Sequence, residues 1–208
     1  MRPMKVVCYV LDVRCFASDY YFWLDKLPEE RRAKSLRFVQ EKDRLLSLGG
    51  GLLIEAFVGH GKYRYGEFGK PYKKHRPSFS LSHSGTYCFL AVASNEVGAD
   101  IQRIENKDQR MVAYCFDEEE RTRIKSQEDF FSAWSEKEAL GKYFGFGIKD
   151  PKKTPVRPLT DDKVLFEGKT CYVAHGRFED YVFAVASGEP IKLGIEPVDL
   201  EKIKKLVL

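Results

Sequence analysis

The feature of the sequence that most constrains its fold is a weak internal repeat. The apolar run FLAVAS, which ends at Ser94, is echoed by VFAVAS, which ends at Ser187. Two further echoes keep the same order: Glu-Glu-Arg begins at residues 29 and 119, and Glu-Ala followed by Gly-Lys-Tyr begins at residues 55 and 138. Because separate short echoes share one order, they predict two similar units in tandem, with a ligand cleft between them.

The elements expected in each unit are strands and helices in mixture. Residues 5–13 and 87–94 have strand patterns, and residues 43–58 form a leucine-rich core helix in which three glycines permit close packing. We predict an α+β fold of two α/β halves related by a pseudo-twofold axis, each a small antiparallel sheet packed with helices. The halves span residues 1–96 and 97–208, and residues 163–187 of the second form a closing hairpin.

Composition limits the class of protein more than its function. With 208 residues, 43% hydrophobic and 32% charged, the chain is typical of a globular protein, and its net charge of +4 is mild. Five cysteines without a C-x-x-C pair predict reduced thiols and argue against zinc. Neither a signal peptide nor an apolar run of bilayer length is present, so we predict a cytoplasmic protein without membrane contact.

A basic, glycine-rich stretch follows the first core helix, over residues 60–85. It predicts a loop system, and such a loop suits phosphate because glycine lets backbone N–H groups approach the oxygens. Ser80, Ser82, His83 and Ser84 at its end all form hydrogen bonds readily, although a purely structural histidine is an equally simple interpretation. The basic residues, against the single acid Glu67, are Lys62, Arg64, Lys70, Lys73, Lys74 and Arg76.

A carboxylate interrupts the strand predicted over residues 97–101. Asp100 and Gln102 are two residues apart, so their side chains lie on the same face of the strand. Burying an acid is unfavourable unless it is paired or bound to a metal ion. The pattern leaves both alternatives open.

The stretch from Phe130 to Gly147 predicts one helix ended by glycines. Trp134, Glu138 and Lys142 are spaced four residues apart and therefore lie along one side of it. A carboxylate and an ammonium group one turn apart suit metal and phosphate chemistry. The alternative is a surface ion pair that stabilises the helix by about 0.3 kcal/mol.

Together these stretches resemble the 4′-phosphopantetheinyl transferases, in particular the monomeric two-half type that acts on peptide and polyketide synthetases. The stretch Gly69-Lys70-Pro71 resembles the family's GKP motif, and Phe79-Ser80-Leu81-Ser82-His83-Ser84 resembles its F-N-[IL]-S-H-S motif, with serine for asparagine. The stretch from Val97 to Gln102 resembles [IV]-G-[IV]-D-[IV]-E, with glutamine for the last acid. The stretch from Trp134 to Lys142 resembles W-x-x-K-E-[AS]-x-x-K.

The resemblance implies transfer of 4′-phosphopantetheine from coenzyme A to a serine of an apo carrier protein, with release of adenosine 3′,5′-bisphosphate. It implies Mg²⁺, with Mn²⁺ as an alternative, held by Asp100 and Glu138, and Gln102 stands at the position of a third acid. Glu138 would accept the serine proton. Lys142 and His83 would hold phosphate oxygens, and Lys142 would stabilise charge on the leaving group.

The resemblance also assigns the coenzyme A site. Lys70 and Pro71 would line the nucleotide, together with Ser82 and His83 of the serine-rich motif. Arg31 and Lys34 match the basic positions that hold the ribose 3′-phosphate, and Ser47 would contribute there.

The implied partner is an acyl or peptidyl carrier protein, acidic around its acceptor serine, which a positively charged protein would attract. Apolar residues from Met111 to Tyr114 lie where the family docks its carrier, and the family type predicts a monomer. One rival is a non-catalytic coenzyme A or nucleotide-binding module, which the missing third acid would suit. Another is a nucleic-acid binder using residues 62–76, but the chain contains no recognisable module of that kind, so we predict no nucleic acid.

Overall fold

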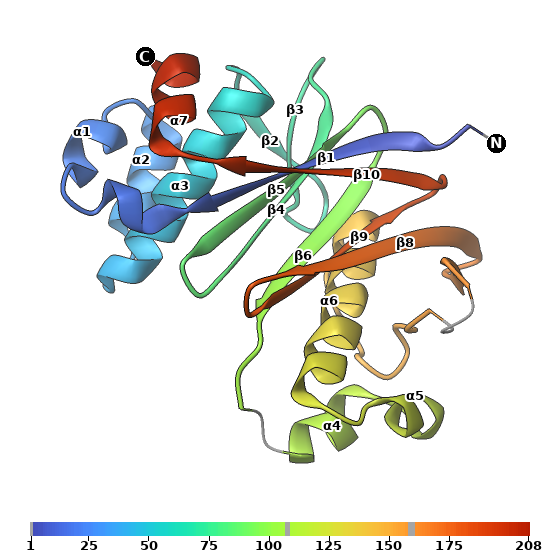
Figure 1. The fold of residues 1–208 in the computed structure, drawn as a ribbon. Coiled ribbons are helices and arrows are strands. Elements are labelled where there is room, and N and C mark those ends of the chain that lie inside the picture. The colour runs from blue at the N-terminus through green and yellow to red at the C-terminus, as the bar shows by residue number, and fades with distance from the viewer. Residues whose placement is uncertain (1, 107–108, 158–160) are drawn as a thin grey trace.

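The computed structural model describes residues 2–106, 109–157 and 161–208, and it confirms the predicted α+β class. Two sheets form the centre of the molecule, with the long helix of each half on the outside (Figure 1). The first half consists of β1 (Met4–Asp12), the 3₁₀ helix η1 (Val13–Phe16), α1 (Tyr20–Leu24), α2 (Glu29–Leu36), α3 (Glu41–Phe57), β2 (Tyr63–Tyr65), β3 (Pro71–Lys73), β4 (Ser78–Ser84) and β5 (Tyr87–Ala93).

The second half repeats the order strand, helices, strands. Its elements are β6 (Val97–Arg103), α4 (Gln109–Cys115), α5 (Glu118–Arg123), α6 (Gln127–Phe144), β7 (Lys163–Phe166), β8 (Lys169–Phe178) and β9 (Tyr181–Ser187), and the chain ends with β10 (Ile191–Val198) and α7 (Leu200–Val207). The strand order is β10-β1-β5-β4 in the first sheet and β6-β9-β8-β7 in the second. The expected closing hairpin is therefore a three-stranded meander, β7-β8-β9.

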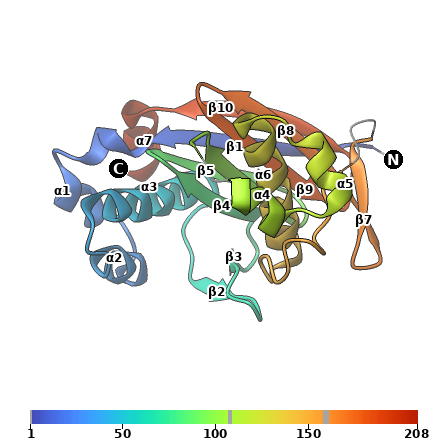
Figure 2. The ribbon, with the colours of Figure 1, turned by 90° about the horizontal axis from the view of Figure 1, so that it is seen from below.

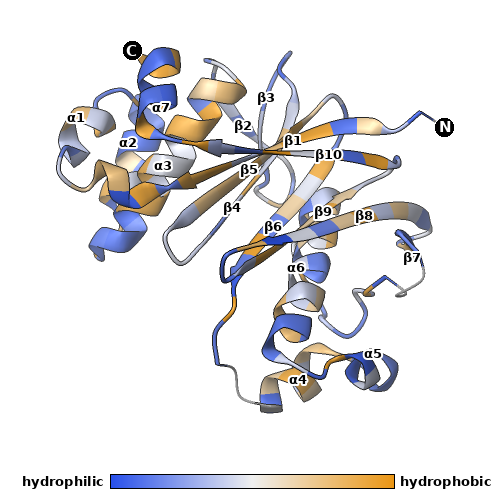
Figure 3. Cartoon of the chain, viewed as in Figure 1, coloured by the Kyte–Doolittle hydropathy of each residue, from blue (hydrophilic) through white to orange (hydrophobic). Residues whose placement is uncertain are grey.

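Each strand turns alternate side chains to opposite faces of its sheet, and the packing of these faces defines the layers of the molecule. One face of the first sheet packs on α3 through leucines and Phe79, whereas the opposite face packs on the second sheet through residues such as Phe89 and Phe183. The other face of the second sheet packs on α6 through Ala184 and Ala186. The molecule is thus a four-layer arrangement of helix, sheet, sheet and helix. Figure 3 shows hydrophobic residues along the central strands and hydrophilic residues on α2 and α5.

Glycines allow α3 to approach the first sheet closely, as predicted. A Cβ at Gly50 would lie 2.8 Å from the Leu81 side chain of β4, and one at Gly49 would lie 2.5 Å from the Val13 side chain of η1 and 3.5 Å from Cys88 Sγ of β5. The predicted loop system, in contrast, contains short strands. The β2–β3 ribbon projects beside the C-terminal end of α6 (Figure 2), and β4 carries the serine-rich motif.

The sequence echo identifies β5 and β9 as corresponding strands, but its register is out by one residue. The echo aligns Ala91 with Ala184, since both offsets, 184 − 91 and 187 − 94, equal 93. Ala91 lies between the two sheets, whereas Ala184 faces α6. Side chains alternate along a strand, so a slip of one residue moves every side chain to the opposite face.

The end of the chain does not stay with the second sheet. Strand β10 pairs in parallel with β1 from Met4–Ile191 to Leu11–Val198, and Ile203 of α7 lies in the core beneath α3. We keep the division at residues 96 and 97 as a proposal for the repeated part of the chain only. The last 18 residues, from Ile191 to Leu208, join the sheet of the first half.

The contact between α6 and β6 depends on Gly98. A Cβ there would lie 2.0 Å from the Ala139 carbonyl oxygen and 2.3 Å from the Tyr143 nitrogen, both of them backbone atoms of α6. Backbone atoms cannot move aside as a side chain can. Only glycine therefore permits this helix-to-strand distance.

We predict that Gly98→Ala lowers the free energy of unfolding by about 1–3 kcal/mol, the usual effect of overpacking a core. Urea denaturation would measure it. The matched control is Gly194→Ala in β10, where a Cβ would meet only the Val6 carbonyl oxygen at 3.8 Å. Equal stability of the two variants would contradict the proposed close packing.

Candidate functional site

The candidate site is organised around Asp100, which is only 2% exposed. Its Oδ1 accepts hydrogen bonds from the Ser82 hydroxyl at 2.6 Å and from Lys142 Nζ at 2.5 Å. Its Oδ2 accepts one from Gln102 Nε2 at 2.8 Å. The structure thus brings together four of the predicted residues from β4, β6 and α6.

The two halves meet along β4 and β6 through side chains rather than through strand pairing. The Ser80 hydroxyl accepts a hydrogen bond from the Ala99 nitrogen at 2.9 Å, and the Ser84 hydroxyl accepts one from the Arg103 nitrogen at 2.9 Å. Ser80, Ser82 and Ser84 alternate along β4, so all three point toward β6. The Ser80 and Ser84 hydroxyls bond backbone groups on the open edge of β6, and the Ser82 hydroxyl bonds the Asp100 side chain, so the three serines hold β6 beside the first sheet.

Helix α6 brings Glu138 and Lys142 to the seam between β4 and β6. Ser126 and Asp129 form a capping box at its start, and Gly145, with φ of 85°, ends it in the left-handed region. The four-residue spacing then directs both side chains toward β6, where Lys142 also meets the Ser82 hydroxyl at 2.9 Å. Trp134, on the same side, packs in the cluster with Phe116 and Phe130.

Glu138 is half-buried and, within the described part of the chain, no hydrogen bond or ion pair involves its side chain. Burial raises the pKa of Glu138, the nearby Asp100 carboxylate raises it further, and Lys142 partly offsets both. A carboxylate in this state has both oxygens available to a ligand.

The donor set at this site fits a magnesium ion. Two carboxylates, from Asp100 and Glu138, and the Gln102 amide are hard oxygen donors, which Mg²⁺ prefers. In the described residues no group of three His, Cys, Asp or Glu side chains has the arrangement of a metal cluster. A cation here would therefore complete its shell from the amide, from water or from a phosphate ligand.

His83 belongs to the same motif but points away from the serines. Partial burial lowers the pKa of His83, the positive charge of Lys142 lowers it further, and the carboxylates of Asp100 and Asp43 oppose the shift. Lys34 adds a smaller lowering effect. The charges that act on His83 come from Lys142 and Asp100 at the seam and from Lys34 of α2 and Asp43 of α3.

The predicted 3′-phosphate residues gather on α2 and α3. Arg31 is buried, donates from Nη2 to the Ser47 carbonyl oxygen at 3.0 Å, and has no hydrogen-bond partner for its buried Nε. The Ser47 hydroxyl accepts a hydrogen bond from Ser35 at 2.8 Å, whereas Lys34 is exposed. Their role in ligand binding stays a prediction.

Lys70 and Pro71 belong to the first half and lie next to the seam. Lys70 donates to Glu96 and, at 2.7 Å, to the Val97 carbonyl oxygen on the edge of β6. Both residues line a cavity of about 240 Å³ whose far wall contains Lys142. This cavity lies between the halves, where the sequence predicts the ligand cleft.

Lys137, the lysine that precedes Glu138 in the motif, is completely buried. Its Nζ donates to both Glu120 oxygens at 2.8 and 2.7 Å and to the carbonyl oxygens of Pro151 and Thr154. Burial lowers the pKa of Lys137, and the Glu120 carboxylate opposes that shift. Lys137 therefore joins α6 to α5 and to the segment that follows α6.

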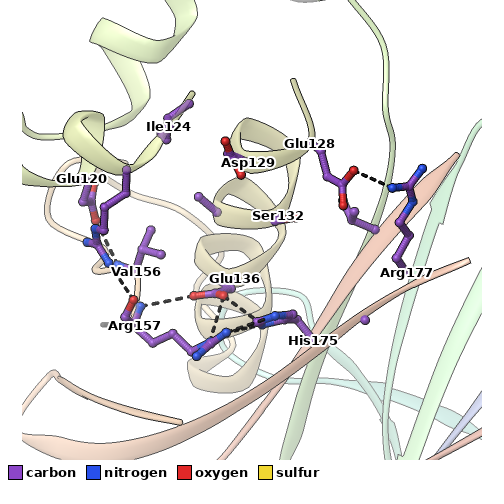
Figure 4. A pocket seen from close by; sticks show the side chains of 14 residues that line it. Glu120, Ile124, Glu128, Asp129, Ser132, Glu136, Val156, Arg157, His175 and Arg177 are labelled. Carbon is purple, nitrogen blue, oxygen red and sulfur yellow. Dashed lines mark hydrogen bonds and ion pairs between the residues drawn. The ribbon is translucent and has the colours of Figure 1, made fainter. Parts of the chain in front are cut away.

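Sequence reasoning missed a second ionic cluster on α6. Glu136 points away from the seam, toward Arg157 and His175, and these side chains border a separate cavity of about 350 Å³ (Figure 4). The W-x-x-K-E pattern leaves position 136 unspecified, so no motif signalled it. The serine alternation along β4, in contrast, was visible in the sequence as S-x-S-x-S.

Comparison with known proteins agrees with this geometry. The family model described as the 4′-phosphopantetheinyl transferase superfamily matches residues 96–186. The 4′-phosphopantetheinyl transferase gsp of Aneurinibacillus migulanus is 29% identical over 185 residues, covering 73% of this chain and 77% of that protein. A 4′-phosphopantetheinyl transferase of Bacillus subtilis is 26% identical and Sfp of Bacillus subtilis (strain 168) is 23% identical, each covering 90% of this chain and 93% of the relative.

Fold and site together define an α+β protein with a carboxylate-and-lysine centre at the seam of two halves. The chain resembles the 4′-phosphopantetheinyl transferase superfamily, both through the family model that residues 96–186 match and through relatives that are 23–29% identical over most of its length. The resemblance predicted from the motifs, and the prediction that the chain is an enzyme of this family, are confirmed by these matches.

We predict that Glu138→Gln stabilises the metal-free protein at pH 8. The pKa of Glu138 is raised in the folded state, so the ionised form disfavours folding at any pH above that raised value. The gain decreases as the pH falls through the raised pKa and vanishes below the ordinary glutamate value of about 4.3. Thermal unfolding in EDTA at several pH values measures this gain in stability. Glu105→Gln, at an exposed residue, is the control. A gain that does not depend on pH would contradict the electrostatic cause.

Proposed function

We propose that the protein transfers 4′-phosphopantetheine from coenzyme A to a serine hydroxyl of an apo acyl or peptidyl carrier protein, releasing adenosine 3′,5′-bisphosphate. The observation that carries the proposal is the meeting of Asp100, Glu138 and Lys142 at the seam, beside the cavity that also contains Lys70 and Pro71. The names of the relatives support the same reaction.

Asp100 and Glu138 would hold Mg²⁺, with the Gln102 amide turned so that its oxygen faces the ion or a bound water. Amide oxygen and nitrogen are interchanged by a simple flip, so the present bond to Asp100 does not prevent this. Bound Mg²⁺ would neutralise charge on the pyrophosphate of coenzyme A, a large contribution in phosphoryl transfer. Mn²⁺, which accepts the same oxygen donors, is the alternative ion.

The other side chains bind and orient. Lys142 is 27% exposed on its side chain and lines the cavity, so its ammonium can exchange Asp100 for a phosphate oxygen and stabilise the leaving group. His83 and Ser82 would donate to phosphate oxygens near it. Glu138 would accept the proton of the attacking serine, directly or through water.

The nucleotide would lie across the first half. Lys70 and Pro71 would line the adenosine side of the cavity, and Lys34 would meet the ribose 3′-phosphate. The buried Arg31, with a donor lacking a partner, would support the same phosphate together with Ser47. This placement follows the family motifs and remains part of the proposal.

The carrier protein would dock on the second half beside α4, where Met111 and Tyr114 are 41% and 66% exposed. We propose a monomer that binds neither nucleic acid nor membrane and acts in the cytoplasm. Within the part of the chain that the structure describes, no helix combines the length and the apolar character needed to cross a bilayer.

The direct test mixes the protein with coenzyme A, Mg²⁺ and apo carrier proteins from fatty acid, polyketide and peptide systems, and reads each carrier by mass spectrometry. We expect a gain of one phosphopantetheine on at least one carrier. Asp100→Ala and Glu138→Ala should lose transfer by at least about a hundredfold while remaining folded, as judged by circular dichroism. Coenzyme A binding without any transfer would favour the hypothesis of a non-catalytic binding module. Salt-dependent DNA binding without coenzyme A affinity would favour the hypothesis of a nucleic-acid binder.

We also predict that Gln102→Glu tightens Mg²⁺ binding, because it adds a third carboxylate beside Asp100. The apparent Mg²⁺ concentration for half-maximal transfer should fall, and Glu105→Gln provides a distant charge control. An unchanged Mg²⁺ dependence would mean that residue 102 does not contact the ion.

A further inference from the structure

Asp100 and His175 lie at opposite ends of one row across the second sheet. Asp100 pairs with Ala184 of β9, and Ala184 pairs with His175 of β8. Directly paired residues of antiparallel strands point to the same face, so all three face α6. Two interstrand steps separate the ends by about 10 Å.

Helix α6 lies across the middle of this row. Ala184 packs with Ala139 and Leu140 of the helix. A helix with its side chains is about 10–12 Å wide, roughly the length of the row. Each flank of α6 therefore lies above one end of the row, with Glu138 on the flank of Asp100 and Glu136 on the flank of His175.

Glu136 is held tightly on its flank. It is 4% exposed, accepts hydrogen bonds from the Arg157 nitrogen at 3.2 Å and from Arg157 Nε at 3.1 Å, and lies 3.3 Å from His175 Nδ1. Figure 4 shows the carboxylate between these two partners. Arg157 is itself fixed, because its Nη1 donates to the Asp161 carbonyl oxygen and its own carbonyl oxygen accepts from Arg123 of α5.

The adjoining cavity does not require a ligand to explain these charges. Each acid that lines it has a partner: Glu136 pairs with Arg157, Glu128 with Arg177 and Glu120 with Lys137, and Asp129 accepts hydrogen bonds from the backbone nitrogens of Lys125 and Ser126. The ionic cluster therefore acts within the protein.

We propose that Glu136, Arg157 and His175 are positioning residues that fix the rotation of α6 about its axis and thereby hold Glu138 against Asp100. Successive helix residues are 100° apart, so Glu136 and Glu138 project to opposite flanks. A rotation that releases Glu136 necessarily moves the Glu138 carboxylate away from β6. The inference rests on the proposed function, since it takes the Asp100–Glu138 pair to be the cation site.

The test measures Mn²⁺ affinity in the presence of coenzyme A by electron paramagnetic resonance, together with thermal unfolding. Glu136→Gln and Arg157→Gln should weaken Mn²⁺ binding by about tenfold, the usual effect of losing a group that orients a metal ligand. Glu128→Gln is the matched control. Glu128 lies on the same helix as Glu136 and lines the same cavity, and the substitution breaks its exposed ion pair with Arg177 of β8. Its Mn²⁺ affinity should equal that of the wild type.

Two further variants separate positioning from stability. Glu136→Met with Arg157→Met removes both buried charges, so the melting temperature should recover while Mn²⁺ binding stays weak. In a Glu138→Gln background, Glu136→Gln should weaken Mn²⁺ binding no further, because the effect passes through Glu138.

The outcomes distinguish the positioning role of Glu136, Arg157 and His175, which we call the clamp, from the proposed metal site. If the wild type binds Mn²⁺ and the Glu136 and Arg157 variants bind it equally well, the clamp is refuted and the site stands. A further tenfold loss in the Glu138→Gln background likewise refutes the clamp. If the wild type binds no Mn²⁺ with coenzyme A, the proposed metal site fails and the inference fails with it.

Discussion

A buried carboxylate requires compensation, and the compensation of Asp100 brings the structure together. Its three partners come from three places: Ser82 from the first sheet, Gln102 from its own strand and Lys142 from α6. Because an uncompensated charge at 2% exposure would be strongly unfavourable, each of these elements must reach Asp100 for the fold to be stable. The same requirement places an acid, a lysine and serine hydroxyls around one point at the seam of the halves.

The strands β6 and β1 occupy corresponding places in the two halves, but the site described above lies at the edge of β6. Strand β6 has an open edge, whose backbone groups bond Ser80, Ser84 and Lys70 of the first half. The corresponding strand of the first half, β1, has its outer edge covered by β10. The returning end of the chain therefore closes one edge with backbone hydrogen bonds, and the other edge is left to side chains, which can also bind ligands.

Much of the fold and the centre of the site could be predicted from the sequence. The echoes predicted two halves, and the i, i+4 spacing of Glu138 and Lys142 located them on one side of a helix. The register of the echo was wrong by one residue, because Ala91 and Ala184 are alike in sequence but face different layers. The cluster of Glu136 and Arg157 could not be predicted, since its members are 21 residues apart and belong to no periodic pattern.

Periodicity in the sequence identifies which residues share a helix side or a strand face, and glycines mark the end of α6, whereas the predicted start at Phe130 lies three residues after the observed start at Gln127. Those properties follow from short-range backbone sterics and from side-chain periodicity. Which faces meet depends on contacts between segments that are distant in the chain. Asp100 meets Lys142 and lies near Glu138 because α6 can approach β6 at Gly98, and that approach brings together residues 98 and 139, which are 41 positions apart in the chain. Periodicity carries no information about distances of that kind.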